Sequence, residues 1–422
     1  MATEAKTQKR LTGGQRTKLV LLGFPTFGLS VAATMVSTYL PVLLNQLSGP
    51  ALTGAMIGGE GLFGLFLPLL VGSWSDSVQT RFGSRLPFML AAAPAMVVAL
   101  VTMPLLHSIV PLGLLLALFY VGYFTYYAPY RALYPDVVPD EQRARSQGVQ
   151  KTWREIGLGA SLVGGGLLLA VSQALPFVVA AGTIAAVTLV FARHAKDPGK
   201  GEEEERERPR EVLRRVRELV AERPKIGWLL LSNSLWELTV AALKTFVVLY
   251  ITVGLGKSTS MASAVLAVVA VSVVGGALTA GALGDRMRPP RLMKHASWVY
   301  GAALLAPLFT QSTLLIAAVI PAAFAAGMIM ALPYAELMGM LDEEHHGLAA
   351  GMFGLSRGAG TLLGPVLAGA AVTLLKGPLA STQGYAAVFG VASVAAFLSL
   401  IGVRHLDSGR ERSRTRMSRA RA

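Results

Sequence analysis

The stretch Gly72-Ser-Trp-Ser-Asp-Ser-Val-Gln-Thr-Arg-Phe-Gly-Ser-Arg-Leu-Pro87 is a short polar segment set between two long apolar runs. A weaker copy, Gly281-Ala-Leu-Gly-Asp-Arg-Met-Arg-Pro-Pro-Arg291, follows in the second half of the chain, and both segments read Gly-x-x-x-Asp followed by arginines. A second matching pair, Pro129-Tyr-Arg-Ala-Leu133 and Pro333-Tyr-Ala-Glu-Leu337, lies at nearly the same offset. A parallel repeat of roughly two hundred residues is the length of a six-helix membrane unit used twice.

The composition is that of a membrane protein. Hydrophobic residues make up 53% of the 422 residues and charged residues only 15%, which is more apolar surface than a soluble chain of this length buries. The net charge of +14 comes from basic residues in short segments between apolar runs, a pattern that encodes topology, so we expect no nucleic-acid partner. The chain has no cysteine, which excludes disulfides, thiolate metal sites and cysteine nucleophiles.

Apolar runs long enough to cross a bilayer predict an all-α polytopic membrane protein with about twelve transmembrane helices in two parallel six-helix repeats. The expected domains are an N-terminal bundle at 1–193, a cytoplasmic linker at 194–226 and a C-terminal bundle with a basic tail at 227–422. The expected crossings lie near 19–45, 51–73, 87–107, 109–133, 147–172, 176–193, 227–253, 261–283, 293–311, 313–333, 347–375 and 381–404.

Lysine and arginine collect in the loops on one side of these crossings, whereas the opposite loops hold only Lys257 and Lys376. By the positive-inside rule, both termini and the linker are cytoplasmic in a multi-pass plasma-membrane protein. The loop between the tenth and eleventh crossings is the exception, because it carries acids and two histidines.

The linker is expected to contain one amphipathic helix. Pro209 suits a first helical turn, and Pro224 would stop the helix. Between them Val212, Val216, Leu219 and Val220 share one face. The helix either lies across the bundle or membrane surface, or is a solvated tether between the halves.

The charges of the 72–87 loop suggest a gate. Asp76, at the end of the second crossing, is placed to cap a neighbouring helix, and Arg81 and Arg85 follow on a tight turn at Gly83, placed to pair with Asp136. Such contacts would exist in only one state of a rocking bundle. Asp285 occupies the position of Asp76 in the second repeat, and the alternative is that these charges only fix topology.

These motifs resemble the major facilitator superfamily over nearly the whole chain. The Gly-x-x-x-Asp loops are similar to its signature between helices 2 and 3 and between helices 8 and 9. Ser75-Asp76 with Arg81-Phe82-Gly83-Ser84-Arg85-x-Pro87 resembles the sucrose-transporter and glycoside–cation symporter branches, as do Phe27-Gly28 with Tyr39-Leu40-Pro41 and Arg131-Ala132-Leu133-x-x-Asp136. The acids that these branches carry in helices 2 and 4 are replaced here, with Phe63 and Leu67 before Pro68 and with Tyr120. Substrate and coupling ion are therefore not carried over.

Ionisable residues inside the membrane are costly and point to function. Counting about 1.5 Å per residue puts Glu60, Glu237 and Arg357 near the midplane. The resemblance implies that helices 2 and 11 face each other, so Glu60 and Arg357 are expected to form a charge-paired gate. Arg154 and Glu155 are shallower, and either couple transport or form a structural pair.

Glu237 is the first candidate for ion coupling, with Glu60 and Glu155 next, because low-dielectric surroundings favour a neutral carboxyl group while water or a nearby cation favours the charged one. Asn233 and Trp236 lie close to Glu237 on a helix that, by the resemblance, lines the central cavity. Together they would offer polar groups and an aromatic face to a hydroxyl-rich solute. The alternative is an ion pair between Glu237 and Lys244, two turns away.

Four tyrosines, Tyr120, Tyr123, Tyr127 and Tyr130, form a single stripe on the fourth crossing. Tyr123 and Tyr127 are the candidates for substrate contact, and the alternative for the stripe is helix packing and interface anchoring.

The expected function is secondary transport by alternating access, with small-molecule symport of a sugar or glycoside coupled to a proton or another cation. The alternative is proton-coupled export of drugs or metabolites, although Gly164-Gly165-Gly166 in the fifth crossing lacks the Gly-Pro motif usual in such exporters of the superfamily. No Walker-type loop or clustered catalytic set is present, so we expect neither an enzyme nor a cofactor or metal, and we expect a monomer in the bilayer.

Overall fold

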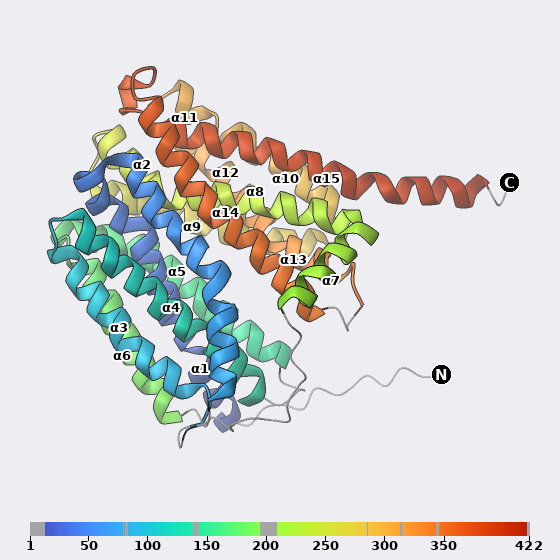
Figure 1. Cartoon of the computed structure of the whole chain (residues 1–422). Coiled ribbons are helices and arrows are strands. Elements are labelled where there is room, and N and C mark those ends of the chain that lie inside the picture. Colours follow the sequence, from blue (N-terminus) through green and yellow to red (C-terminus); the bar gives the residue numbers. More distant parts are fainter. Residues whose placement is uncertain are drawn as a thin grey trace.

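The computed structural model describes residues 13–78, 80, 83–137, 143–194, 209–284, 286–312, 315–342 and 346–419. These residues form an all-helical bundle in two halves (Figure 1). The N-terminal half consists of α1 (Gly13–Gly23), α2 (Pro25–Ser77), α3 (Leu86–Thr102), η1 (Met103–Leu105), α4 (Ile109–Val137), α5 (Arg143–Val171) and α6 (Leu175–His194).

A linker helix, α7 (Pro209–Glu222), leads into the C-terminal half. That half consists of α8 (Pro224–Leu249), the π-helical turn η3 (Tyr250–Gly254), α9 (Thr259–Gly284), α10 (Pro289–Ala303), α11 (Ala306–Phe309), α12 (Leu315–Ala331), α13 (Pro333–Met338), α14 (His346–Leu374), η5 (Ala380–Thr382) and α15 (Ala387–Arg419).

The predicted membrane fold of about twelve crossings is confirmed. Ten helices among the described residues are long and apolar enough to span a bilayer. One of them, α2, is two crossings, because Gly49 has a left-handed φ of 74° and Pro50 follows it. The remaining crossing is α10 with α11, which is interrupted after Ala303. Six crossings per half return the chain to its starting side, so α1, α7 and the end of α15 share one side, here named the linker side, opposite the distal side.

The two halves are closed on the distal side. Gly54 of α2 packs against the backbone of Pro365 on α14, and Gly166 of α5 packs against Ser263 of α9. Tyr385, just before α15, donates a hydrogen bond of 2.8 Å to Asn45 near the distal end of the first crossing. Figure 1 shows the halves meeting at this end and diverging toward α1 and α7.

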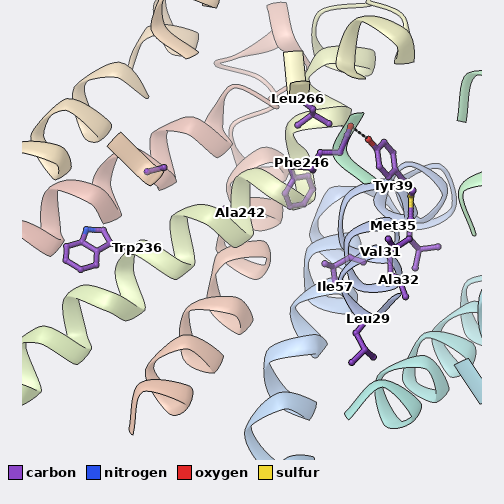
Figure 2. Close-up of a cluster of buried hydrophobic side chains, with 14 of the residues drawn as sticks. Leu29, Val31, Ala32, Met35, Tyr39, Ile57, Trp236, Ala242, Phe246 and Leu266 are labelled. Carbon is purple, nitrogen blue, oxygen red and sulfur yellow. Dashed lines mark hydrogen bonds between the residues drawn. The ribbon is translucent and has the colours of Figure 1, made fainter. Parts of the chain in front are cut away.

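Small residues allow this close approach. A methyl group added at Gly61 of α2 would collide with Gly358 and Leu362 of α14, so these helices meet backbone to backbone, as small residues permit in membrane helices. Figure 2 shows the buried side chains near the interface, with Met35 and Tyr39 of α2 on one side and Phe246 of α8 on the other. The outer surface, in contrast, exposes large apolar side chains, among them Leu69, Val171, Val271, Leu278 and Leu374.

The linker helix α7 docks on the C-terminal half. It begins at Pro209 and ends before Pro224. Leu219 is buried, and Val220 lies against Gly227 of α8. Arg223 donates to the Met340 carbonyl oxygen at 2.7 Å and pairs with Asp342 at 3.3 Å. These contacts favour a bundle-bound helix over a free tether.

The turn of the 72–87 loop has the predicted form. Gly83 has a φ of 96° and exchanges backbone hydrogen bonds with Thr80, while α2 ends just after Asp76 and Arg85 precedes α3. Asp136 lies in the last turn of α4. The side chains of Asp76 and Asp136, and residues Arg81 and Asp285, lie outside the described part of the structure, so their gating role stays a prediction.

Candidate functional site

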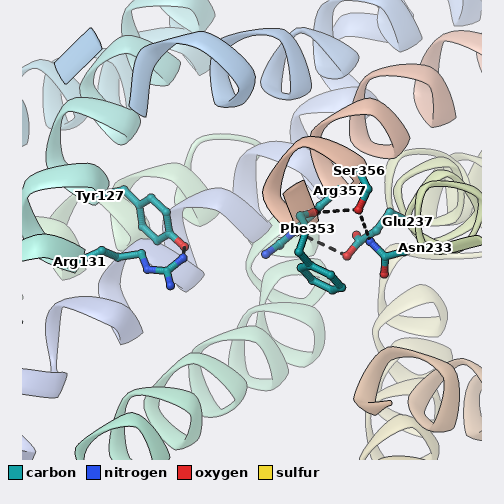
Figure 3. Close-up of polar contacts among 7 residues, drawn as sticks. All are labelled: Tyr127, Arg131, Asn233, Glu237, Phe353, Ser356 and Arg357. Carbon is teal, nitrogen blue, oxygen red and sulfur yellow. Dashed lines mark hydrogen bonds and ion pairs between the residues drawn. The ribbon is translucent and has the colours of Figure 1, made fainter. Parts of the chain in front are cut away.

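An ion pair joins α8 to α14 in the middle of the C-terminal half. The Nε atom of Arg357 lies 3.7 Å from Oε1 of Glu237. One turn toward the linker side, Asn233 donates a hydrogen bond of 2.8 Å to the hydroxyl oxygen of Ser356 (Figure 3). The helices approach closely here because Gly360 leaves room for the backbone of Ser234 and the side chain of Glu237.

Charged side chains from both halves surround this ion pair. We name Glu60, Arg154, Glu237, Lys244 and Arg357 the central charge cluster. Lys244 lies within electrostatic range of the other four members, and Arg357 within range of Glu237 and Glu60. Glu60 and Arg154 belong to α2 and α5 of the N-terminal half, whereas the other three belong to α8 and α14.

The cluster is accessible to solvent. The Arg357 side chain is 45% exposed and that of Glu237 15% exposed. Arg357 has electrostatic partners on α2, α4 and α8, so its exposed surface lies between the halves rather than on the lipid-facing outside. A polar, water-accessible surface at this depth is where a transport site is expected.

Two tyrosines of α4 complete the site on the N-terminal side. Tyr123 and Tyr127 stack with their ring centroids 5.9 Å apart and their planes 12° from parallel. Arg131 donates a hydrogen bond of 3.2 Å to the Tyr127 hydroxyl group. Figure 3 shows Tyr127 and Arg131 across from Arg357 and Glu237. Both tyrosines lie within electrostatic range of Arg154 and Arg357.

The other two tyrosines of the stripe are packing residues. Tyr120 is buried and donates to the Ile57 carbonyl oxygen at 3.1 Å, and Tyr130 is buried and donates to the Leu22 carbonyl oxygen at 2.9 Å. The stripe therefore divides into two residues near the cluster and two that hold α4 against α2 and α1.

Two sequence-based expectations, and the alternative proposed for Glu237, need correction. Trp236 is fully buried and donates a hydrogen bond to Ser297 of α10, so its indole belongs to the core of the C-terminal half and faces no substrate in this state. Arg357 pairs with Glu237 instead of Glu60. Lys244 is within electrostatic range of Glu237, but the ion pair of Glu237 is formed with Arg357.

Glu155 is partly buried on α5 and does not belong to the central charge cluster. Its neighbour Arg154 does, although sequence reasoning treated the two as one unit. Consecutive helical residues point about 100° apart, which separates their surroundings.

Sequence reasoning missed Ser356 and the Asn45–Tyr385 hydrogen bond. A signal for Ser356 was present in Gly360 and Gly364, a small-residue pair that predicts a close helix contact on α14. No comparable signal marks Asn45, because Tyr385 is 340 residues away in sequence.

Comparison with known proteins agrees with this architecture. The family model of the Major Facilitator Superfamily matches residues 22–296 and 229–420. The chain therefore belongs to the major facilitator superfamily, whose members are transporters, and its small-molecule substrate would cross the bilayer through the helical bundle.

Solute carrier family 45 member 3 of Mus musculus is 30% identical over 150 residues, and the protein of the same name in Homo sapiens matches to the same extent. The match covers 32% of this chain and 27% of each relative, so the chain aligns with only about a quarter of their length.

Solved structures share the fold over nearly the whole chain. A bacterial homologue of the human lysosomal transporter Spinster, in an inward-facing and occupied conformation, has a TM-score of 0.75 at 15% identity, covering 94% of this chain and 96% of that one. The nucleoside transporter NupG has a TM-score of 0.74 at 14% identity, covering 93% and 99%.

Proposed function

We propose that this protein is a proton-coupled symporter of a sugar or glycoside that works by alternating access. The observation that carries the proposal is the Glu237–Arg357 ion pair, which lies beside a solvent-accessible surface shared by the two halves. A carboxylate in such a place can exchange a proton with either side as the halves rock. The distal closure corresponds to the cytoplasm-facing state if the linker side is cytoplasmic, as the basic loops predict.

The sugar assignment is supported by the sequence resemblance to the sucrose-transporter and glycoside–cation symporter branches. The geometry adds Tyr123 and Tyr127, whose stacked rings and hydroxyl groups suit the apolar faces and hydroxyl groups of a sugar ring. Proton-coupled export of metabolites would use the same carboxylate and is the second candidate.

The test uses Glu237→Gln in proteoliposomes. Because the amide fixes the neutral form, exchange of substrate between equal concentrations should survive, whereas accumulation driven by a proton gradient should be lost. The substrate for this assay would come from a thermal-shift screen of the purified protein against sugars, glycosides and exporter substrates.

Glu155→Gln is the matched control. Glu155 is also an intramembrane carboxyl group, next to Arg154 on α5, but it lies outside the central charge cluster. It should lower stability or rate without uncoupling. Normal, pH-dependent accumulation by Glu237→Gln would make Glu237 structural and move the coupling role to Glu60 or Glu155.

A further inference from the structure

We propose that the transported solute carries an anionic group, a carboxylate or a phosphate, which binds between Arg154 of the N-terminal half and Arg357 of the C-terminal half. The inference rests on the transport function proposed above and adds the charge of the substrate to it.

The first observation is the charge balance of the central charge cluster. Its cations are Arg154, Lys244 and Arg357, and its carboxylates are Glu60 and Glu237. Three cations against two carboxylates leave one positive charge in excess when all are ionised. Uncompensated charge at membrane depth is costly, so a bound anion would stabilise this arrangement.

The second observation is that both guanidinium groups have unused donors. A guanidinium carries five N–H donors and stays protonated in proteins. Among the described residues, Arg357 engages only its Nε atom, at a long 3.7 Å, and the Arg154 side chain makes no hydrogen bond or ion pair. Both side chains are exposed, so a solute in the space between the halves can reach these donors.

Glu60 is already counted in this balance and is not held in a direct ion pair with any described residue in the observed state. Among the described contacts it forms no ion pair within 4.0 Å, and it lies within electrostatic range of Lys244 as well as Arg357. Arg357 has only the long contact to Glu237 as a direct partner, and no described contact gives Arg154 a carboxylate partner, so both arginines can accept a further anion.

The third observation is where the two arginines come from. Arg154 is held by α5, whose backbone at this point accepts a hydrogen bond of 2.8 Å from Ser30 of α2. Arg357 is held by α14 against α8. Planar guanidinium groups recognise carboxylates and phosphates through paired hydrogen bonds. An anion bound to both would connect the halves, and the hydroxyl groups of Tyr123 and Tyr127 would lie within reach of the rest of the solute.

The test compares two probes of the same shape. The compounds p-nitrophenyl β-D-glucuronide and p-nitrophenyl β-D-glucoside differ only in a carboxylate replacing a hydroxymethyl group. Binding to the purified protein is measured by thermal shift and by tryptophan fluorescence at fixed ionic strength. The glucuronide should bind at least about tenfold more tightly, because hydrogen bonds to charged groups contribute about 1.5–3 kcal/mol. Equal binding of the two glycosides would overturn the anionic site and leave sugar transport standing.

Substitutions of the two arginines and of a nearby lysine test whether the preference for the glucuronide arises at the proposed site. Arg154→Gln and Arg357→Gln should each remove most of the preference for the glucuronide. Lys151→Gln should keep the preference, because Lys151 is an exposed cation of α5 on the turn before Arg154 and lies outside the cluster. A preference unchanged in both arginine variants would refute the site.

A second probe pair separates the two proposals. Succinate and succinamide share a carbon skeleton but contain no sugar. If neither glycoside binds while succinate stabilises the wild type and not the arginine variants, the sugar assignment fails and the anionic site stands. If succinate also gives no stabilisation beyond that in the arginine variants, the anionic site fails.

Discussion

The partner of Arg357 can be identified by two double-mutant cycles. In the structure Arg357 pairs with Glu237 and not with Glu60, although all three residues lie at similar depth. The first cycle combines Glu237→Gln with Arg357→Gln, and the second combines Glu60→Gln with Arg357→Gln. Only the first removes a direct contact, so only the first should show strong coupling.

The magnitude follows from the geometry. At 3.7 Å, two unit charges attract by roughly 4 kcal/mol at an effective dielectric constant of about 20. Both side chains are partly exposed, Arg357 at 45% and Glu237 at 15%, so water screens much of this attraction. Exposed pairs contribute about 0.2–1 kcal/mol, whereas breaking a buried pair costs about 3–5 kcal/mol. We expect a coupling free energy of about 1 kcal/mol, between these limits.

The two single variants should destabilise the protein to different extents. Arg357→Gln leaves a carboxylate that remains near Lys244 and is able to take up a proton. Glu237→Gln leaves a guanidinium that cannot lose its charge, within electrostatic range of Lys244. Glu237→Gln should therefore be the more destabilising of the two.

The assay is unfolding of the purified protein in mixed micelles by SDS titration, which gives the free energy of unfolding for each variant. The second cycle is the control and should be additive within about 0.5 kcal/mol. Additivity in the first cycle, or equal coupling in both, would refute the pairing.

Two further predictions concern topology and gating. Single cysteines at Ser172, Ser258 and Ser381, all exposed on the distal side, should react with an impermeant thiol reagent in whole cells, whereas cysteines at Ala221 and Met287 on the linker side should not, and the reverse pattern would overturn the orientation. Tyr385→Phe removes the 2.8 Å hydrogen bond to Asn45. Losing a hydrogen bond costs about 1 kcal/mol, which would raise the population of the distally open state about fivefold. Spin labels at Ser172 and Ser258 should therefore show a larger share of long distances. Tyr126→Phe loses only a bond to Thr188 within the N-terminal half and should leave that distribution unchanged; equal shifts in both variants would contradict the gating role of Tyr385.

The fold was predictable because its signals are local. Hydrophobic length marks each crossing, and repeated motifs mark the two halves. The deviations are also local. Gly49 and Pro50 separate two crossings within α2 by a single non-helical residue, and the tenth crossing is followed by a separate short helix, α13, because Leu332 precedes Pro333. Such breaks change where a helix ends without changing the topology.

The site was less predictable because a contact depends on helix rotation as well as depth. Counting residues places Glu60, Glu237 and Arg357 at one level but does not say which faces meet. The rotation of α14 is set by Gly360 and Gly364, which pack against α8, and Arg357 lies about one turn before Gly360. The positions of Gly360 and Gly364 therefore predict that Arg357 forms its ion pair with Glu237.

The same argument explains Trp236. Asn233 and Glu237 are four residues apart and share the face of α8 that meets α14, whereas Trp236 is one residue from Glu237 and is rotated by about 100°. That rotation directs the indole to Ser297 of α10. Their closeness in sequence therefore predicted one shared surface for Asn233, Trp236 and Glu237, whereas the fold places them on two different surfaces.

Arg357 belongs to both the proton-coupling proposal and the anionic-site proposal, and this sharing links them physically. While Glu237 is ionised, it holds the Nε atom of Arg357 and offsets its charge. When Glu237 takes up a proton, that attraction is lost, and the central charge cluster holds three cations against the single carboxylate of Glu60. Protonation thus frees a donor and raises the positive charge at the point where an anionic solute would bind, so proton and solute favour each other's binding. Linkage of this kind requires no direct contact between the proton and the solute. The two proposals together predict different phenotypes: Glu237→Gln should fix the state that favours anion binding and uncouple transport, whereas Arg357→Gln should remove the group proposed to sense the proton and hold the anion.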